Sequence, residues 1–201
     1  MPNECLIIFT RYPEPGKTKT RMIPALGAVG AASLQRQMTE FTLFKAQKIP
    51  QLIEVHFAGG NVQLMEEWLG NDVVFRSQVE GDLGMRMQCA FAGAFSAEMR
   101  KVVMIGVDCP DLNSAVLTEA FTALETNDLV LGPAADGGYY LIGLNCFIPQ
   151  LFMGINWGTS VVFAQTNAMA QKLNLKVHNL IMLNDVDLPE DLVFWQKYQG
   201  G

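Results

Sequence analysis

The sequence contains few of the features that mark exported, membrane-bound or zinc-binding proteins. Its four cysteines are widely spaced without a Cys-x-x-Cys pair, and its two histidines have no cysteine neighbours, which argues against a disulfide framework and a zinc site. The longest apolar runs are far too short to cross a bilayer, and a strand-like run begins where a signal peptide would lie. We therefore expect a cytoplasmic protein with reduced thiols and no membrane insertion.

Charged residues are scarce as well, at 17% of 201 residues, and no segment has low complexity. Because 50% of the residues are hydrophobic, the chain can form a sizeable core and is not intrinsically disordered. The length predicts one domain, spanning residues 1–201. The formal net charge of −6 argues against a nucleic-acid-binding surface, so a local concentration of positive charge indicates a specific anion instead.

Strand-like and helical runs alternate along the chain. Predicted strands cover residues 4–10, 52–58, 73–77, 102–107 and 129–133, and predicted helices between them cover residues 29–49, 62–69, 83–98 and 114–125. Further elements are expected at residues 139–144 (an antiparallel strand after a tight Asp-Gly reversal), 161–173 (helix), 175–183 (strand) and from 188 (helix). The pattern predicts an α/β fold with a mixed, mostly parallel sheet between two helical layers.

Positive charge is concentrated in the loop that follows the first predicted strand. The candidates for nucleotide binding in it are Arg11, Gly16, Lys17, Thr18, Lys19 and Arg21. Such a loop between a strand and a helix suits phosphate, because backbone N–H groups and the helix N-terminus add to the side-chain charge. Gly16-Lys17-Thr18 resembles the end of a Walker A motif, but Arg11 stands where that motif needs its first glycine. We expect a different kind of phosphate loop; the alternative is a solvated loop whose cations pair with nearby carboxylates.

Two acidic motifs follow predicted strands. Asp108 comes directly after the strand at 102–107, at the edge where ligands bind in open α/β sheets, and its hard carboxylate suits Mg²⁺ or Mn²⁺. The alternative is that Asp108 stabilises a turn before a helix. Asp187 follows the last predicted strand and could meet Asp108 to complete a metal pair. With Glu190 it also forms the pattern of a capping box, and this structural role is compatible with metal binding.

A glycine-containing turn lies between residues 78 and 86. Gln78 and Arg86 flank it and could touch a base or a phosphate, and Gly84 would allow a close approach. A simple entry into a helix, with Asp82 as its cap, explains the same residues without any function. We assign Gln78, Gly84 and Arg86 to nucleotide binding.

Two later segments are candidates for contact with the acceptor. The turn Asp136-Gly137-Gly138 would let a base or sugar approach the backbone closely, although an Asp-Gly hairpin also forms without a function. We also assign Trp157, Thr159 and Ser160, in the loop before the helix at 161–173, to substrate binding. The alternative for the tryptophan is that it belongs to the core.

Five motifs in this order resemble a bacterial family of small GT-A-type proteins, which have the nucleotide-diphospho-sugar transferase fold and carry the label glycosyltransferase. The motifs lie at residues 15–22, 81–87, 106–112, 132–144 and 185–192. The family is similar to archaeal phospholactate guanylyltransferases and, more distantly, to molybdenum cofactor guanylyltransferases. The resemblance covers nearly the whole chain and implies a GT-A fold with the nucleotide over the N-terminal half of the sheet.

The same resemblance implies roles for single residues. Lys19 and Arg21 match the basic pair that meets nucleotide phosphates, Asp108 matches the metal-binding acid, and Asp187 matches the second metal ligand. The sequence also departs from related chains. The Gly-x-Gly-Thr-Arg signature of sugar nucleotidyltransferases is absent, and Leu188 stands where related chains often carry threonine.

These residues predict a metal-dependent transferase that acts on a nucleotide and an unidentified small acceptor. In one interpretation, an acceptor phosphate or hydroxyl attacks the α-phosphate of an NTP and pyrophosphate leaves. In the other, an NDP-sugar is attacked at its anomeric carbon. We favour nucleotidyl transfer, because three cations after the first strand suit a triphosphate better than a diphosphate. A nucleotide-binding sensor without turnover is a third interpretation, and the base, the acceptor and the oligomeric state stay open.

Overall fold

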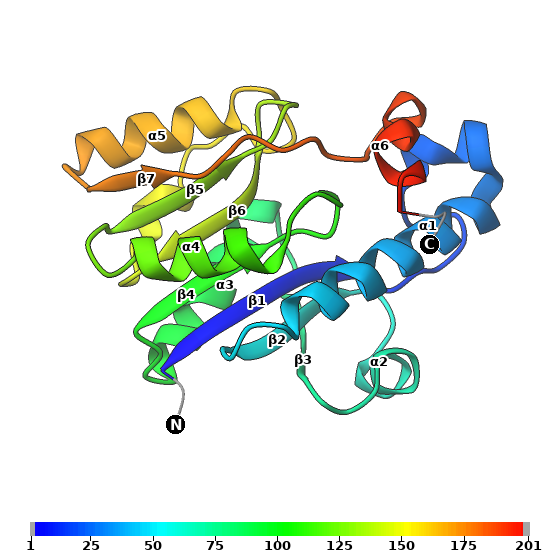
Figure 1. The fold of residues 1–201 in the computed structure, drawn as a ribbon, viewed down its shortest axis with the longest axis horizontal. Helices are drawn as coiled ribbons and strands as arrows, with labels where there is room; N and C mark the ends of the chain where they lie inside the picture. Colours follow the sequence, from blue (N-terminus) through cyan, green and yellow to red (C-terminus); the bar gives the residue numbers. More distant parts are fainter. Residues whose placement is uncertain (1–2, 199–201) are drawn as a thin grey trace.

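The computed structural model describes residues 3–198 and has a seven-stranded sheet at its centre (Figure 1). The strand order is β3-β2-β1-β4-β6-β5-β7. The strands are β1 (Glu4–Arg11), β2 (Leu52–Ala58), β3 (Val74–Ser77), β4 (Lys101–Ile105), β5 (Leu129–Pro133), β6 (Tyr139–Leu144) and β7 (Val177–Asn179). β6 runs antiparallel to its neighbours β4 and β5, whereas the other pairs are parallel. The predicted mixed sheet and its antiparallel strand are therefore confirmed.

Helices cover both faces of the sheet. They are α1 (Ile23–Ala46), α2 (Val62–Leu69), α3 (Leu83–Ser96), α4 (Ser114–Ala123), α5 (Val162–Lys172) and α6 (Leu192–Gln196), with short 3₁₀ helices η1 (Thr20–Met22), η2 (Pro149–Phe152) and η3 (Pro189–Asp191). In β1, Leu6 and Ile8 face a core shared with α1 and α4, whereas Cys5 and Ile7 face a core shared with α3 and α5. All four side chains are fully buried, as expected for a strand that is covered on both faces.

The helix after the phosphate loop begins earlier than the sequence pattern predicts. We expected residues 29–49, whereas α1 begins at Ile23 and ends at Ala46. Pro24 occupies its first turn, where a missing N–H group costs no hydrogen bond. Gly27, with φ of 70°, then interrupts the helical dihedral angles. Because the helix is kinked there, its apolar period can be followed in the sequence only beyond the kink.

The C-terminal segment differs from the prediction as well. The strand predicted at 175–183 shortens to β7, and the final helix begins as η3 and continues as α6. The capping box predicted for Asp187 and Glu190 is wrong by one position. The carboxylate of Asp191 accepts hydrogen bonds from the backbone N–H groups of Leu188 (2.7 Å) and Asp187 (3.1 Å). The carboxylate of Asp187 is therefore available for other contacts.

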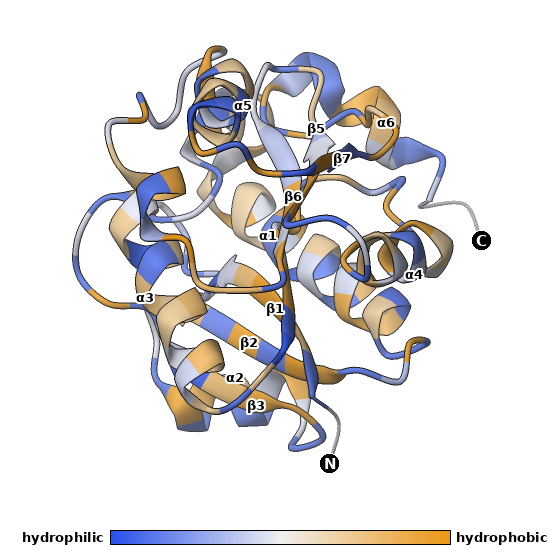
Figure 2. Cartoon of the chain, turned by 90° about the vertical axis from the view of Figure 1, so that its left-hand side faces the viewer, coloured by the Kyte–Doolittle hydropathy of each residue, from blue (hydrophilic) through white to orange (hydrophobic). Residues whose placement is uncertain are grey.

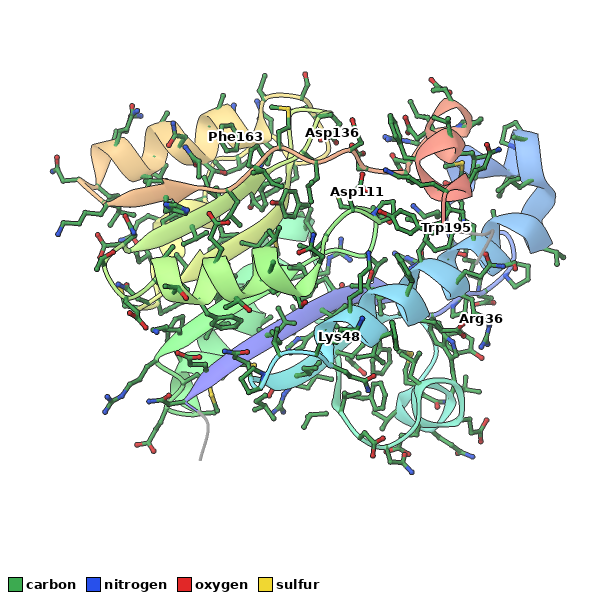
Figure 3. The ribbon with its side chains drawn as sticks, viewed as in Figure 1. Arg36, Lys48, Asp111, Asp136, Phe163 and Trp195 are labelled. Atoms are coloured by element: carbon green, nitrogen blue, oxygen red, sulfur yellow. The ribbon has the colours of Figure 1, made fainter. Side chains whose placement is uncertain are left out.

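The segment after η3 is tied to the loop that follows β4. Trp195 is buried with Met22 of η1 in a small third core between α6 and α1, to which Leu34 and Met38 of α1 also belong. Lys197 and Tyr198 both donate hydrogen bonds to the carboxylate of Asp111, and Figure 3 labels Asp111 and Trp195. These contacts fix the C-terminal segment beside the loop that carries Asp108.

The cysteines are free thiols, and Cys109 is buried beside Asp108. Burial, with the charge of Asp108, raises the pKa of the Cys109 thiol, which suits a side chain that fills space rather than a nucleophile. Among the residues described, the helices include none that is long and apolar enough to cross a membrane.

A partly buried ionic network of Glu54 and His56 on β2 and Arg76 on β3 lies at the side of the sheet that faces α3. Glu54 accepts hydrogen bonds from His56 (2.9 Å) and from Arg76 (2.8 and 3.0 Å). In Figure 2 the colours along β2 alternate, because Glu54 and His56 interrupt its apolar residues. Burial opposes ionisation of Glu54, but the hydrogen bonds from His56 and Arg76 outweigh it and lower its pKa to about 2. The folded protein therefore holds Glu54 as a carboxylate.

Glu54→Gln is expected to weaken the acid sensitivity of folding. Because the pKa of Glu54 falls from 4.5 to about 2 on folding, its ionisation stabilises the folded state above pH 4.5, and this contribution is lost as the pH falls towards 2. The shift corresponds to at most about 3 kcal/mol. Urea unfolding between pH 7 and pH 2 should show lower stability at neutral pH and a shallower pH dependence for the variant. Glu66→Gln, which changes an exposed carboxylate, is the matched control; an identical response of both variants would contradict the expectation.

Candidate functional site

The carboxyl ends of β1 and β4 lie side by side in the sheet, and the loops that follow them meet the hairpin between β5 and β6. Two adjoining cavities open at this edge, the first of about 310 Å³ and the second of about 330 Å³. The residues that line both are Leu83, Gly106, Asp108, Tyr139 and Tyr140. Asp108 therefore lies at the boundary of the two cavities, at the sheet edge where the sequence predicted a ligand.

The first cavity contains cationic side chains that the sequence assigned to a nucleotide. Arg11, at the end of β1, and Arg86, on α3, line it together with Gln78. The Gln78 side-chain amide donates to the carbonyl oxygens of His56 (2.9 Å) and Thr10 (3.2 Å), and its Oε1 accepts a hydrogen bond from Arg86 (3.0 Å). Because both ends of the amide are engaged, Gln78 orients Arg86 rather than presenting a polar group of its own.

A buried polar group in the first cavity was not predicted. Gln35, from α1, lines the cavity and is only 5% exposed. Its side-chain amide donates to the hydroxyl oxygens of Thr10 (3.1 Å) and Thr39 (3.3 Å), which are themselves 2.8 Å apart. Gln35 and Thr39 are four residues apart and hence on one face of the helix. The sequence carries that spacing, but nothing in it shows that this polar face is turned towards the sheet.

The second cavity contains most of the residues predicted to contact the acceptor. Asp136 and Gly138 line it from the hairpin turn, and Trp157 and Thr159 line it from the following loop. Asp136, labelled in Figure 3, accepts a hydrogen bond from the backbone N–H of Gly138 at 2.7 Å. The turn therefore has the structural role expected of an Asp-Gly hairpin and also presents a carboxylate to the cavity.

Two further carboxylates, Asp185 and Asp187, line the second cavity. Asp187 was predicted as a metal ligand, whereas Asp185 was not assigned a role. Burial, followed by the charge of nearby Asp136, raises the pKa of Asp185. Val186 between the two acids is fully buried, so it anchors the segment while its neighbours reach the cavity. In the sequence, the alternation Asp185-Val186-Asp187 after a predicted strand could have identified Asp185 as a second acid of this site.

Lys19, expected to reach the phosphates, is engaged within the protein. Its side chain is 4% exposed, and its Nζ donates to Asp108 Oδ1 at 2.8 Å and to the carbonyl oxygen of Val186. The backbone N–H of Val186 donates to the carbonyl oxygen of Asp108 at 2.8 Å. Lys19 itself has φ of 42°, in the left-handed region that residues other than glycine seldom adopt. The three hydrogen bonds among Lys19, Asp108 and Val186, which we call the Lys19 clamp, join the loop after β1, the loop after β4 and the C-terminal segment.

Arg21 forms an ion pair with Asp187 in the second cavity. The two side chains are 63% and 37% exposed, so water screens the pair and a competing anion can reach the guanidinium. Arg21 is thus more accessible than Lys19, although the sequence assigned both to the same task.

Besides Lys19, three residues of the phosphate loop line neither cavity. Gly16 has φ of 80° in a turn, and Lys17 forms an exposed ion pair with Glu14 at 2.8 Å. Thr18 is buried, and its hydroxyl donates to the carbonyl oxygen of Glu14 at 3.3 Å. The structure therefore brings Arg11 and Arg21 to the cavities and leaves Gly16, Lys17 and Thr18 in the turn between them.

Gly84, Gly137 and Ser160 also lie outside both cavities, where they have packing roles. A Cβ atom at Gly84 would lie 2.3 Å from Nε1 of Trp157, and one at Gly137 would lie 2.1 Å from the carbonyl oxygen of Ser160. The two glycines allow the loop containing Trp157 and Ser160 to close onto α3 and onto the hairpin.

A divalent cation fits this site only in part. In the part of the chain that the structure describes, no group of three His, Cys, Asp or Glu side chains is arranged to hold a metal ion. Asp108 and Asp187 each have one oxygen bound by a cationic side chain. The carboxylate chemistry suits Mg²⁺ or Mn²⁺ if substrate phosphates and water supply the other oxygen ligands.

Comparison with known proteins places the chain in a family. A family model described as "Uncharacterized protein conserved in bacteria (DUF2064)" matches residues 42–159. The chain belongs to this family. A solved structure of a putative nucleotide-diphospho-sugar transferase from Desulfovibrio desulfuricans G20 is similar over 100% of this chain and 89% of that chain, with 34% identity and a TM-score of 0.94. No curated protein matches the chain.

More distant members of the fold are similar in structure alone. The 4-diphosphocytidyl-2C-methyl-D-erythritol synthase of Anaerococcus prevotii DSM 20548 has a TM-score of 0.65 at 10% identity, over 99% of this chain and 97% of that chain. A Mycobacterium tuberculosis H37Rv protein, solved in complex with manganese, has a TM-score of 0.55 at 13% identity, over 94% and 95% of the two chains. The predicted nucleotide-diphospho-sugar transferase fold is confirmed.

Proposed function

We propose that this DUF2064 protein is a metal-dependent transferase that moves a nucleotidyl group from an NTP to a small acceptor and releases pyrophosphate. One observation carries the proposal: Arg11 and Arg86 line one cavity, carboxylates line the other, and the two meet at Asp108. A nucleotide is anionic and fits the first cavity by charge. The similar Desulfovibrio protein, named as a nucleotide-diphospho-sugar transferase, supports a nucleotide substrate.

The cationic side chains have distinct tasks in this reaction. Arg86, held by Gln78, and Arg11 bind the nucleotide in the first cavity. Arg21 lines the second cavity, as Asp108 does, and neutralises phosphate charge when it leaves Asp187. A divalent cation bound by Asp108 and Asp187 would supply further charge stabilisation at the reacting phosphate.

The acceptor binds in the second cavity and attacks the α-phosphorus of the NTP. A bond forms between the acceptor oxygen and this phosphorus, the bond to the bridging oxygen breaks, and pyrophosphate leaves. The proton of an acceptor hydroxyl passes to a carboxylate of the cavity. Because the protein forms no covalent bond in this scheme, its contribution is to position the reactants and stabilise charge.

Lys19 acts through Asp108 and is a positioning residue. Its ammonium group is 4% exposed and already bound to the protein, so it is too enclosed to contact a phosphate without rearrangement. The Lys19 clamp fixes Asp108 relative to the segment that carries Asp185 and Asp187. The relative position of Asp108 and Asp187, the two proposed metal ligands, thus depends on the Lys19 clamp.

Glycosyl transfer from an NDP-sugar is the second candidate, and the name of the Desulfovibrio protein favours it. The same cavities would then hold the nucleoside diphosphate and the sugar. The two reactions release different products: nucleotidyl transfer releases pyrophosphate, whereas glycosyl transfer releases the nucleoside diphosphate. Product analysis therefore separates them.

A thermal-shift screen of four NTPs and common NDP-sugars with Mg²⁺ or Mn²⁺ tests the proposal. A ligand at 100 times its Kd stabilises the folded state by about 2.7 kcal/mol. We expect one NTP to raise the melting temperature, and Arg86→Met to remove most of this shift. Lys48→Met, which removes an exposed cation of the loop after α1 that lies outside both cavities (labelled in Figure 3), should leave the shift unchanged. Stabilisation by an NDP-sugar but not by its parent NTP would overturn nucleotidyl transfer.

A further inference from the structure

We infer that the acceptor is a hydroxyl or amino compound without a phosphate group, such as a sugar, an amino sugar or another polyol. This inference rests on the proposed function and concerns its second cavity. The evidence is the opposite charge of the two adjoining cavities, together with the aromatic wall of the second.

The two cavities differ sharply in charge. The first is lined by the cationic side chains of Arg11 and Arg86 and by one carboxylate, Asp108. The second is lined by one cation, Arg21, and by the carboxylates of Asp108, Asp136, Asp185 and Asp187. Arg21 is paired with Asp187 and, in the proposed reaction, turns to the phosphates of the nucleotide, so it offers no free charge to the acceptor. A phosphorylated nucleotide therefore finds its counter-charges in the first cavity, whereas a second phosphorylated molecule would face carboxylates in the other.

A bound metal ion does not reverse this difference. A divalent cation would balance the charges of Asp108 and Asp187, and the phosphates of the nucleotide bring negative charge of their own. Asp136 and Asp185 then remain as acceptors of hydrogen bonds on the side of the attacking molecule. A phosphate monoester carries a charge of about −1.5 to −2 at neutral pH and would be repelled there. Hydroxyl and amino groups are donors and would be bound.

The wall of the second cavity favours the same class of acceptor. The rings of Trp157 and Tyr139 meet edge to face, with their centroids 6.4 Å apart, and both line the cavity. Gly84 leaves room for the indole to lie directly against α3, because a side chain at that position would overlap it. Rigid aromatic rings beside carboxylates suit a molecule that has apolar C–H faces between its hydroxyl groups, as a sugar does. The aromatic residues supply contact area, and Asp136 and Asp185 supply hydrogen-bond acceptors.

The inference is tested by comparing the binding of sugars that differ from glucose by one amino group or by one phosphate group. The probes are glucose, glucosamine and glucose 1-phosphate, with saturation-transfer NMR detecting weak binding to the full chain loaded with the stabilising nucleotide and Mg²⁺. We expect glucosamine to bind most tightly and glucose 1-phosphate least. In Asp136→Asn and Asp185→Asn, glucosamine should bind on the order of 10-fold more weakly while glucose 1-phosphate gains. Asp72→Asn, which changes an exposed acid outside the cavity by the same charge, should alter neither.

The outcomes separate this inference from the proposed function. If the nucleotide binds but glucose 1-phosphate is the preferred probe, the acceptor class is overturned while nucleotidyl transfer stands. If Asp136→Asn, Asp185→Asn and Asp72→Asn weaken glucosamine equally, the cavity carboxylates do not select the acceptor and the inference also fails. If no nucleotide stabilises the chain in the thermal-shift screen, the proposed function fails and the acceptor site fails with it.

Discussion

Asp108→Asn is expected to lower the turnover number on the order of 1,000-fold, because a metal ion at the reacting phosphate is worth several kcal/mol. Asp108 is the acid that lines both cavities, and its carboxylate also receives the hydrogen bond from Lys19. The amide has a similar shape but no charge to bind the metal. Steady-state release of pyrophosphate measures the effect, with the nucleotide that the thermal-shift screen selects.

The matched control for this variant lies three residues further along the same loop. Asp111 binds Lys197 and Tyr198 and lines neither cavity, so Asp111→Asn should cost some stability but keep the turnover number within about 3-fold of that of the parent protein. Asp108→Asn keeps an oxygen that can accept the hydrogen bond from Lys19 but loses the charge beside that buried ammonium, so it should melt somewhat below the parent protein, as Asp111→Asn does. A turnover number that is unchanged in Asp108→Asn would remove Asp108 from the mechanism.

Lys19→Met is expected to lower the turnover number on the order of 100-fold with a smaller effect on nucleotide affinity. Displacing a reacting group by about 1 Å can cost this much, and the Lys19 clamp holds Asp108 against Val186. The loss of the buried ammonium should also destabilise the fold by about 1–3 kcal/mol, since Asp108 and the Val186 carbonyl lose their donor. Separate measurement of kcat and of the nucleotide Kd distinguishes a positioning role from direct binding.

Lys17→Met is the natural control, because it removes the same charge two residues away. Lys17 is 66% exposed and forms an ion pair with Glu14, so its loss should change stability by less than about 1 kcal/mol and leave kcat unchanged. If Lys19→Met weakened nucleotide binding as much as turnover, Lys19 would contact the phosphates directly. If both variants behaved alike, the clamp would have no special role.

The sheet could be predicted from sequence because its signals are local. Continuous apolar runs such as Leu6–Ile8 mark strands that are covered on both faces, and the Asp-Gly turn at Asp136 marks the antiparallel reversal. The position of Asp108 could also be predicted from the sequence, because a residue directly after a strand of an open α/β sheet lies at the edge where ligands bind. The kink at Gly27 could not be predicted, because the sequence does not show whether a glycine within a helical pattern keeps helical dihedral angles.

The failures of prediction at the site are contacts between distant segments. Lys19 and Arg21 look equivalent in the sequence, yet Lys19 is enclosed by Val186 and Asp108 whereas Arg21 is exposed. Asp185 was missed for the same reason: its proximity to Asp136 depends on how the C-terminal segment crosses the hairpin. Residue type gives the chemistry, whereas accessibility follows from tertiary packing.

A crystal structure of the protein with the stabilising NTP and Mn²⁺, with the metal located by its anomalous signal, tests the central claim most directly. We expect the base and ribose beside Arg86 in the first cavity, the manganese on the carboxylates of Asp108 and Asp187, and Arg21 moved from Asp187 to the phosphates. The hydrogen bond between Lys19 and Asp108 should persist. A nucleotide seated among the carboxylates of the second cavity, or one bound with no manganese at Asp108, would contradict the proposed mechanism.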